Sequence, residues 1–186
     1  MIRFNLFSLF LILVSHQIAA QSISNQGILE KVQEGKLLQE DAWLIDPMGD
    51  TLYYESFKGK WLIIDYWMQG CRPCIQAFPY LNKLYTSIPK DKIEVIAVFL
   101  GKDIQKWKKT EKRYGLEFPS YYAGWTVKNP FLAMNLQMTV GPDGDQKLQS
   151  QTPQYVLIDP SGKIIDKNFP KPSSTAFKTR IKDLSH

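Results

Sequence analysis

The clearest hydrophobic pattern in the chain is a nearly continuous apolar run at residues 61–67, in which only Asp65 is charged. A second run of the same kind covers residues 93–100. Strands buried on both faces of a parallel sheet give such runs, whereas half-exposed strands alternate apolar and polar residues. The two runs therefore predict central strands of an α/β sheet.

Helical periodicity follows each run. After the first, apolar side chains recur at helical spacing at Ile75, Phe78, Leu81, Tyr85 and Ile88. Pro79 should kink this helix, because it lacks a backbone donor and crowds the preceding turn. Asp103 can cap a second helix that runs to Tyr114. The order strand, helix, strand, helix predicts right-handed crossovers in a parallel sheet.

Shorter elements are expected on both sides of this unit. Weakly periodic residues 28–32 suggest a short helix, and Ser173 or Ser174 can cap a C-terminal one. Apolar stretches and turn residues predict short strands at residues 42–45, 51–54, 118–122, 155–159 and 163–166.

One further helix is predicted late in the chain. Asn129–Pro130 combines a capping residue with proline at the first helical position. The helix would carry Phe131, Met134 and Met138 on one side, and the turn at residues 141–144 would end it.

The N-terminus is expected to direct export. Residues 1–20 combine a positive start at Arg3, an apolar run and small residues at Ala19 and Ala20. This is the pattern of a secretory signal peptide, and it is too short for a comfortable membrane span. An uncleaved anchor is the alternative. We expect a polar segment at residues 21–40 and one domain at residues 41–186, soluble after signal cleavage.

Charge and histidine content exclude two function classes. The formal net charge is +5, and the densest basic run, residues 102–113, fits a solvated helix face. An exported protein rarely meets nucleic acid, so no nucleic-acid partner is expected. A closed zinc site needs about four ligands, but the two histidines are His16, inside the signal, and His186. We therefore expect no metal and no cofactor.

The two cysteines, Cys71 and Cys74, carry the candidate chemistry. A disulfide that encloses only two residues removes little entropy from the unfolded chain, so a purely structural disulfide is a weak interpretation. With Pro73 in the first turn of the helix, Cys71 would lie at its N-cap, where backbone N–H groups and the helix dipole favour a thiolate. Arg72 adds a positive charge. The pattern predicts Cys71 as the nucleophile and the more buried Cys74 as the resolving thiol.

Asp65 lies six residues before Cys71 within the apolar run. Burial of an unpaired carboxylate should raise its pKa, which suits a group that exchanges a proton with the resolving thiol. The alternative is a surface aspartate that interrupts the strand.

These motifs together resemble a thioredoxin-fold protein, more narrowly the exported bacterial TlpA/ResA-like thiol–disulfide oxidoreductases. The resemblance covers residues 42 to the C-terminus. It is carried by Asp-Tyr-Trp-x-x-x-Cys-x-Pro-Cys at residues 65–74, by Pro79, and by the segment at residues 151–162.

The resemblance implies an α/β fold with a central mixed β-sheet flanked by helices. It also implies an N-terminal β extension and a helical insertion at about residues 121–150, before a cis-proline strand. Pro153 would be the cis-proline, and the Thr152–Pro153 bond would expose backbone groups to a substrate strand. We expect the substrate-binding residues to be Trp67, Gly70, Arg72, Pro73, Thr152 and Pro153.

Three positions depart from the family pattern. Gly70 replaces the usual tryptophan before the first cysteine, which should open the surface there. Arg72 replaces glycine, glutamate or valine and would favour a thiolate or an acidic partner. Ala77 replaces a glutamate beside the thiols, so proton handling would fall to Asp65.

The predicted function is an exported, monomeric protein-disulfide oxidoreductase of the bacterial periplasm, acting in the reductive direction. Its partners would be protein disulfides and a thiol electron donor, which a membrane protein could supply. One alternative is a thiol peroxidase, but Ile64 and Met68 stand where that family's motif requires proline and threonine. The other is a non-catalytic binding module that uses the insertion and aromatic residues such as Trp125.

Overall fold

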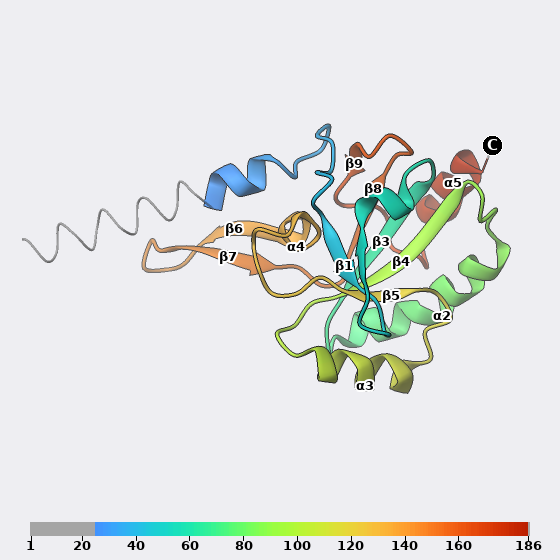
Figure 1. Cartoon of the computed structure of the whole chain (residues 1–186), viewed down its shortest axis with the longest axis horizontal. Coiled ribbons are helices and arrows are strands. Elements are labelled where there is room, and N and C mark those ends of the chain that lie inside the picture. The colour runs from blue at the N-terminus through green and yellow to red at the C-terminus, as the bar shows by residue number, and fades with distance from the viewer. Residues whose placement is uncertain (1–24, 186) are drawn as a thin grey trace, which may run out of the picture.

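A computed structural model describes residues 25–185, which include a seven-stranded sheet with helices on both sides (Figure 1). The strand order is β2-β1-β5-β4-β3-β8-β9. These strands are β1 (Trp43–Ile45), β2 (Thr51–Tyr53), β3 (Trp61–Trp67), β4 (Ile93–Phe99), β5 (Ser120–Tyr122), β8 (Gln154–Ile158) and β9 (Ile164–Asp166). The 3₁₀ helix η1 (Tyr54–Phe57) follows β2. The helices are α2 (Arg72–Ser87), α3 (Ile104–Tyr114), α4 (Pro130–Asn135) and α5 (Thr175–Leu184).

β3 is an inner strand of the sheet, as its apolar sequence predicts. It pairs in parallel with β4 on one side and antiparallel with β8 on the other, so the sheet is mixed. Asp65 is paired with Ala97 of β4 and with Tyr155 of β8. The predicted parallel crossover is confirmed, and the strands predicted at residues 155–159 and 163–166 correspond to β8 and β9, which pair antiparallel as a hairpin.

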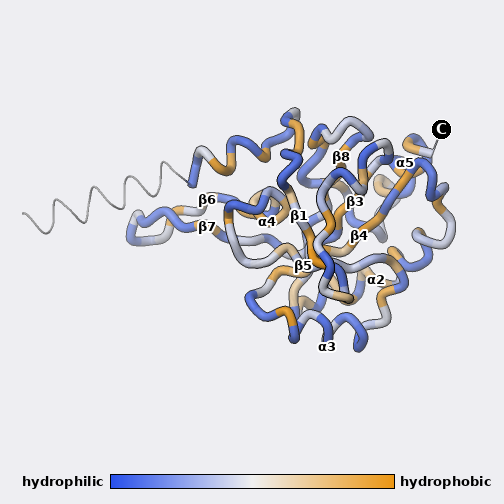
Figure 2. Tube along the Cα trace, viewed as in Figure 1, coloured by the Kyte–Doolittle hydropathy of each residue, from blue (hydrophilic) through white to orange (hydrophobic). Residues whose placement is uncertain are grey.

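The side chains of β3 alternate between two cores. Leu62, Ile64 and Tyr66 belong to the core that includes α4 and the N-terminal segment. Ile63 and Trp67 belong to the core that includes apolar residues of α2, α3 and α5. The apolar residues concentrate along the central strands in Figure 2, whereas the outer helix faces are polar. Each face of the sheet therefore has its own hydrophobic layer.

Side-chain caps fix the helix starts that the sequence predicts. Asp103 accepts hydrogen bonds from the backbone N–H groups of Gln105 and Lys106. At the C-terminal helix, Ser174 accepts from the N–H of Phe177, which decides between the two candidate serines.

The predicted helical insertion is largely a β-hairpin. Asn129 caps α4 as expected, but the helix ends at Asn135. The following residues form β6 (Leu136–Val140), which pairs antiparallel with β7 (Gln146–Ser150). The prediction of a helix that includes Met138 was therefore wrong, and the turn at residues 141–144 closes the hairpin. The side chain of Asn135 is buried and bonded to the segment before β8, which holds the chain at the helix end.

The N-terminal segment is attached to the sheet. Residues 25–30 are helical, close to the predicted position, and Val32 is buried in the core. The N–H of Gly35 donates to the carbonyl of Ile164, and the N–H of Ile164 donates to the carbonyl of Lys36. The predicted signal at residues 1–20 lies outside the described residues. Among residues 25–185, none of the helices has the length and apolar character needed to span a bilayer.

Candidate active site

Cys71 and Cys74 lie at the start of α2, immediately after the loop that leaves the centre of the sheet. Cys71 is the N-cap residue, and its sulfur accepts a hydrogen bond from the backbone N–H of Cys74 at 3.3 Å. The two sulfurs are joined at 2.05 Å. Pro73 occupies the first turn of the helix, where its missing donor costs nothing. This is the arrangement that the spacing predicts.

Gly70 explains how the chain turns into this helix. Its φ is +80°, a conformation that glycine adopts freely and that is strained for residues with a Cβ. Gly70 and Arg72 are both exposed beside Cys71. The departure from tryptophan at position 70 therefore goes together with a left-handed backbone and an open surface at the first cysteine.

The two sulfur-bearing residues differ in accessibility. Cys74 is fully buried in the core beneath α2, whereas Cys71 is partly exposed. An attacking thiol must meet an incoming disulfide, and a resolving thiol needs only to reach its neighbour. The burial of the two residues is what these roles require, and the roles themselves stay a prediction.

Asp65 is completely buried, as its apolar neighbours suggest. Ile63 and Trp67, two positions before and after Asp65 in β3, face the core that contains Cys74. Because side chains two positions apart in a strand face the same side, the Asp65 side chain faces that core as well. Neither carboxylate oxygen has a hydrogen-bond partner within the described chain. Desolvation by burial raises the pKa of Asp65 from 3.8 to about 8. A carboxyl group in this state can hold or release a proton near neutral pH.

A groove of about 510 Å³ lies beside the cysteines on the surface of α2. Pro73 and Ala77 line one side, and Pro153 and Tyr155 of the β8 region line the other. The Thr152–Pro153 bond is cis, as the resemblance implies. Tyr80, which is half-exposed, and Lys171 also line this groove, and sequence patterns gave no signal for either residue.

Trp67 requires a correction. It was expected among the substrate-binding residues, but its side chain is fully buried and packs edge-on against Phe78 and Phe99. It cannot contact a substrate directly, because no part of it reaches the surface. Of the other expected residues, Gly70, Arg72 and Pro73 are exposed, and Thr152 and Pro153 are partly exposed.

A second hollow of about 350 Å³ lies on the other side of the loop before Cys71. Met68 and Gln69 of that loop meet Trp125 of the insertion there, together with Lys102 and Lys106. Trp125 is thus placed next to the redox loop. Among residues 25–185, no cluster of His, Cys, Asp and Glu has the composition of a metal site.

Comparisons with known proteins agree with this geometry. A model of the Redoxin family matches residues 33–181. The thiol-disulfide oxidoreductase ResA of Geobacillus kaustophilus is 33% identical over 79 residues, which cover 42% of this chain and 45% of that protein. ResA of Bacillus anthracis is 28% identical over 139 residues, 74% of this chain and 70% of that protein. The alignment with the first relative thus spans less than half of its length.

Solved structures show the same fold. The thioredoxin domain of a thiol-disulfide oxidoreductase from Bacteroides vulgatus has a TM-score of 0.64 at 21% identity, covering 83% of this chain and 99% of that one. A thiol:disulfide interchange protein from Bacteroides sp. has a TM-score of 0.63 at 22% identity, covering 83% and 91%. The architecture is therefore thioredoxin-like. Since the family model covers most of the sequence, the chain belongs to the Redoxin family and counts TlpA/ResA-like thiol–disulfide oxidoreductases among its relatives.

Proposed function

We propose that the protein is an exported thiol–disulfide oxidoreductase that reduces disulfides of protein substrates through Cys71 and Cys74. The observation that carries this proposal is the position of the two residues: a partly exposed sulfur at a helix N-cap, bonded to a buried one a turn later. The family match and the ResA relatives support the same chemistry.

The first step is attack by Cys71. In the reduced protein its thiolate lies against the N–H of Cys74 and the positive end of the α2 dipole, both of which stabilise negative charge on sulfur. The thiolate attacks one sulfur of a substrate disulfide. A mixed disulfide between Cys71 and the substrate forms, and the other substrate sulfur leaves as a thiolate that takes up a proton.

The second step is resolution by Cys74. Asp65, which faces the same core layer, accepts the proton of the Cys74 thiol when its carboxyl group is ionised, and the resulting thiolate attacks the sulfur of Cys71. The Cys71–Cys74 disulfide forms, and the second substrate thiolate leaves and is protonated. Two electrons pass from the dithiol to the substrate in the complete cycle. An external thiol donor must then reduce Cys71–Cys74 again.

The groove at Pro153 and the exposed Arg72 and Pro73 provide the docking surface in this proposal. Thr152, which is partly exposed, and Gly70, which is exposed, are next in the chain to Pro153 and Cys71 and complete this surface in the proposal. The reductive direction rests on proline as the second spacer residue. Export to the periplasm rests on the signal pattern of residues 1–20, and action as a monomer remains part of the proposal.

The proposal is tested with reduced protein and insulin, whose B chain precipitates when its disulfides are cleaved. We expect the wild-type protein to accelerate precipitation and Cys71→Ser to abolish this activity. Cys74→Ser should accumulate mixed disulfides through Cys71, detected by non-reducing electrophoresis and mass spectrometry. Mixed disulfides through Cys74 in the Cys71→Ser variant would contradict the assignment of the attacking thiol. Rapid peroxide consumption that survives Cys74→Ser would favour a thiol peroxidase instead.

A further inference from the structure

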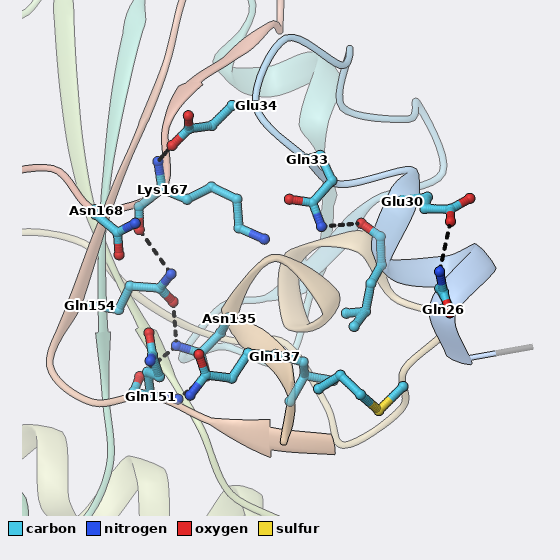
Figure 3. A pocket seen from close by; sticks show the side chains of 13 residues that line it. Gln26, Glu30, Gln33, Glu34, Asn135, Gln137, Gln151, Gln154, Lys167 and Asn168 are labelled. Carbon is cyan, nitrogen blue, oxygen red and sulfur yellow. Dashed lines mark hydrogen bonds between the residues drawn. The ribbon is translucent and has the colours of Figure 1, made fainter. Parts of the chain in front are cut away.

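A larger cavity of about 900 Å³ lies away from the cysteines (Figure 3). Its walls are the N-terminal helix with Gln26 and Glu30, the start of β6 with Gln137 and Met138, and the connection after β9 with Lys167. This volume is within the range of ligand sites. The N-terminal segment and α4 pack on the opposite face of the sheet from α2, so the cavity is separate from the groove beside Cys71.

Two of the amides at this cavity have a structural role. Asn135 donates to the carbonyl of Gln151 at 2.6 Å and to the Oε1 of Gln154 at 2.7 Å. Its Oδ1 accepts from the N–H of Gln151, and Gln154 donates to the carbonyl of Lys167. These bonds, visible in Figure 3, fix the floor of the cavity. Both side chains are buried, and these bonds hold them in place, so we assign them to the floor of the cavity and not to ligand binding.

Other polar groups at the cavity have unused bonding capacity. Within residues 25–185, the side-chain amides of Gln137, Gln151 and Asn168 make no hydrogen bond to the protein. The ammonium of Lys167 has no ion-pair partner there, and Figure 3 shows its side chain extending into the cavity toward Gln33. Burial lowers the pKa of Lys167, which reflects poor solvation of its charged form, and Glu34 only partly opposes this. A carboxylate of a ligand would supply the missing counter-charge.

The strand β6 offers a backbone edge at the same place. In the described chain it pairs only with β7, so its other edge has unpaired N–H and C=O groups. The N-terminal helix borders this edge, since Gln26 and Glu30 line the cavity together with Gln137 and Met138 (Figure 1). Unpaired strand edges accept extended peptides by β-augmentation.

We propose that the cavity binds an extended polypeptide segment of a partner protein, which pairs with the free edge of β6 and places an acidic side chain at Lys167. Residues i and i+2 of an extended chain face the same side. A basic residue of the bound segment, two positions from its acidic residue, would therefore lie at Glu30 and Glu34, which are exposed at the rim of the cavity. Free primary amides match peptide groups, as each offers a donor and an acceptor. Among the described residues that line the cavity, none is aromatic, so this lining offers no ring for sugar stacking. None of the groups involved is a thiol, so the proposal does not depend on disulfide exchange.

The test uses a cysteine-free, fluorescein-labelled peptide, acetyl-Thr-Val-Glu-Val-Lys-Thr-amide, titrated with the purified oxidised protein by fluorescence polarisation. We expect saturable binding at one peptide per chain. Lys167→Met should weaken binding about tenfold, whereas Lys163→Met, which removes an exposed lysine outside the cavity, should leave it unchanged. N-methylation of alternate peptide residues should also weaken binding at least tenfold, because it removes backbone donors.

A change on the peptide side separates recognition from misfolding. With glutamine in place of the peptide's glutamate, Lys167→Met should change affinity less than twofold. Insulin reduction by Lys167→Met should match the wild type, because the residue is not part of the dithiol site. In NMR spectra, the peptide should shift the side-chain amide signals of Gln137 and Asn168. The proposal is overturned if no binding is seen at millimolar peptide, or if the peptide shifts only signals of Cys71 and Pro153. Displacement of the peptide by a neutral oligosaccharide would also overturn it. So would dimerisation of the protein through β6 in place of peptide binding.

Discussion

Replacement of Asp65 by asparagine should stabilise the oxidised protein at neutral pH. The carboxyl group is fully buried and its oxygens have no partner within the described chain. Burial raises its pKa from 3.8 to about 8. Asparagine has nearly the same shape and carries no charge, so the variant removes the cost of ionisation without opening a cavity. The polar desolvation that remains is similar for the amide and for the protonated acid.

The size of the effect follows from proton linkage. Between about pH 4 and pH 8 the folded protein holds a proton on Asp65 that the unfolded chain releases. The free energy of unfolding of the wild type therefore falls as pH rises through this window, by about 1.4 kcal/mol for each pH unit. By pH 7 the loss is about 4 kcal/mol, a large part of the stability of a typical domain. The stability of Asp65→Asn should lack this component.

The assay is urea unfolding of oxidised wild type and variant at pH 4, 5.5, 7 and 8.5. We expect similar stability at pH 4 and a difference that reaches about 4 kcal/mol at pH 7. The matched control is Asp41→Asn, which removes an exposed carboxylate and should change stability by less than about 0.5 kcal/mol. A constant difference between wild type and Asp65→Asn across the pH range would refute the burial-driven shift. Equal stability at pH 7 would refute it as well.

Further predictions concern activity and packing. Asp65→Asn should slow turnover of insulin at least tenfold while Cys71 still forms mixed disulfides, as seen by trapping during single turnover. Gly70→Ala should lower the free energy of unfolding, measured in urea, by about 1–2 kcal/mol, because Gly70 has a positive φ. Gly27→Ala is the control: Gly27 has open space around it and no positive φ, so this variant should not be destabilised. Tyr66→Phe should lower the free energy of unfolding by about 1–3 kcal/mol, because the buried hydroxyl of Tyr66 donates to the carbonyl of Phe131 at 2.6 Å. The control is Tyr53→Phe, which removes an exposed hydroxyl and should leave stability nearly unchanged.

The central strands and the redox turn could be predicted from sequence because their signals are local. An apolar run with one aspartate is enough to place β3, and Cys-x-x-Cys with Pro73 places a helix start directly after the turn. Asp103 likewise marks the start of α3 through its own short-range hydrogen bonds. In these places the structure is determined by residues that are only a few positions apart in the sequence.

The insertion was mispredicted because its structure depends on distant contacts. Met134 and Met138 are four residues apart, a spacing that suits a helix. The helix instead ends where Asn135 bonds to Gln151, sixteen positions later in the chain. The β-branched pair Thr139 and Val140 before a Gly-Pro-Asp-Gly turn was the available signal for a hairpin. The apolar run at residues 61–67 already implied that Trp67 is buried, and its packing against Phe78 of α2 and Phe99 of β4 shows why the expected substrate contact was wrong.

The pairing of β3 with β8 relates the redox site to the 900 Å³ cavity lined by Lys167. Asp65 is opposite Tyr155 and faces the layer of Cys74, while the next pair, Tyr66 and Gln154, faces the other side. Tyr66 holds α4 through the carbonyl of Phe131, and Gln154 holds Asn135 at the cavity floor. Adjacent residues of two strands thus support sites on opposite faces. Because consecutive side chains of a strand alternate between faces, a one-residue slip of β8 against β3 would disturb both sites together, whereas Tyr66→Phe should loosen the cavity and leave the thiols in place.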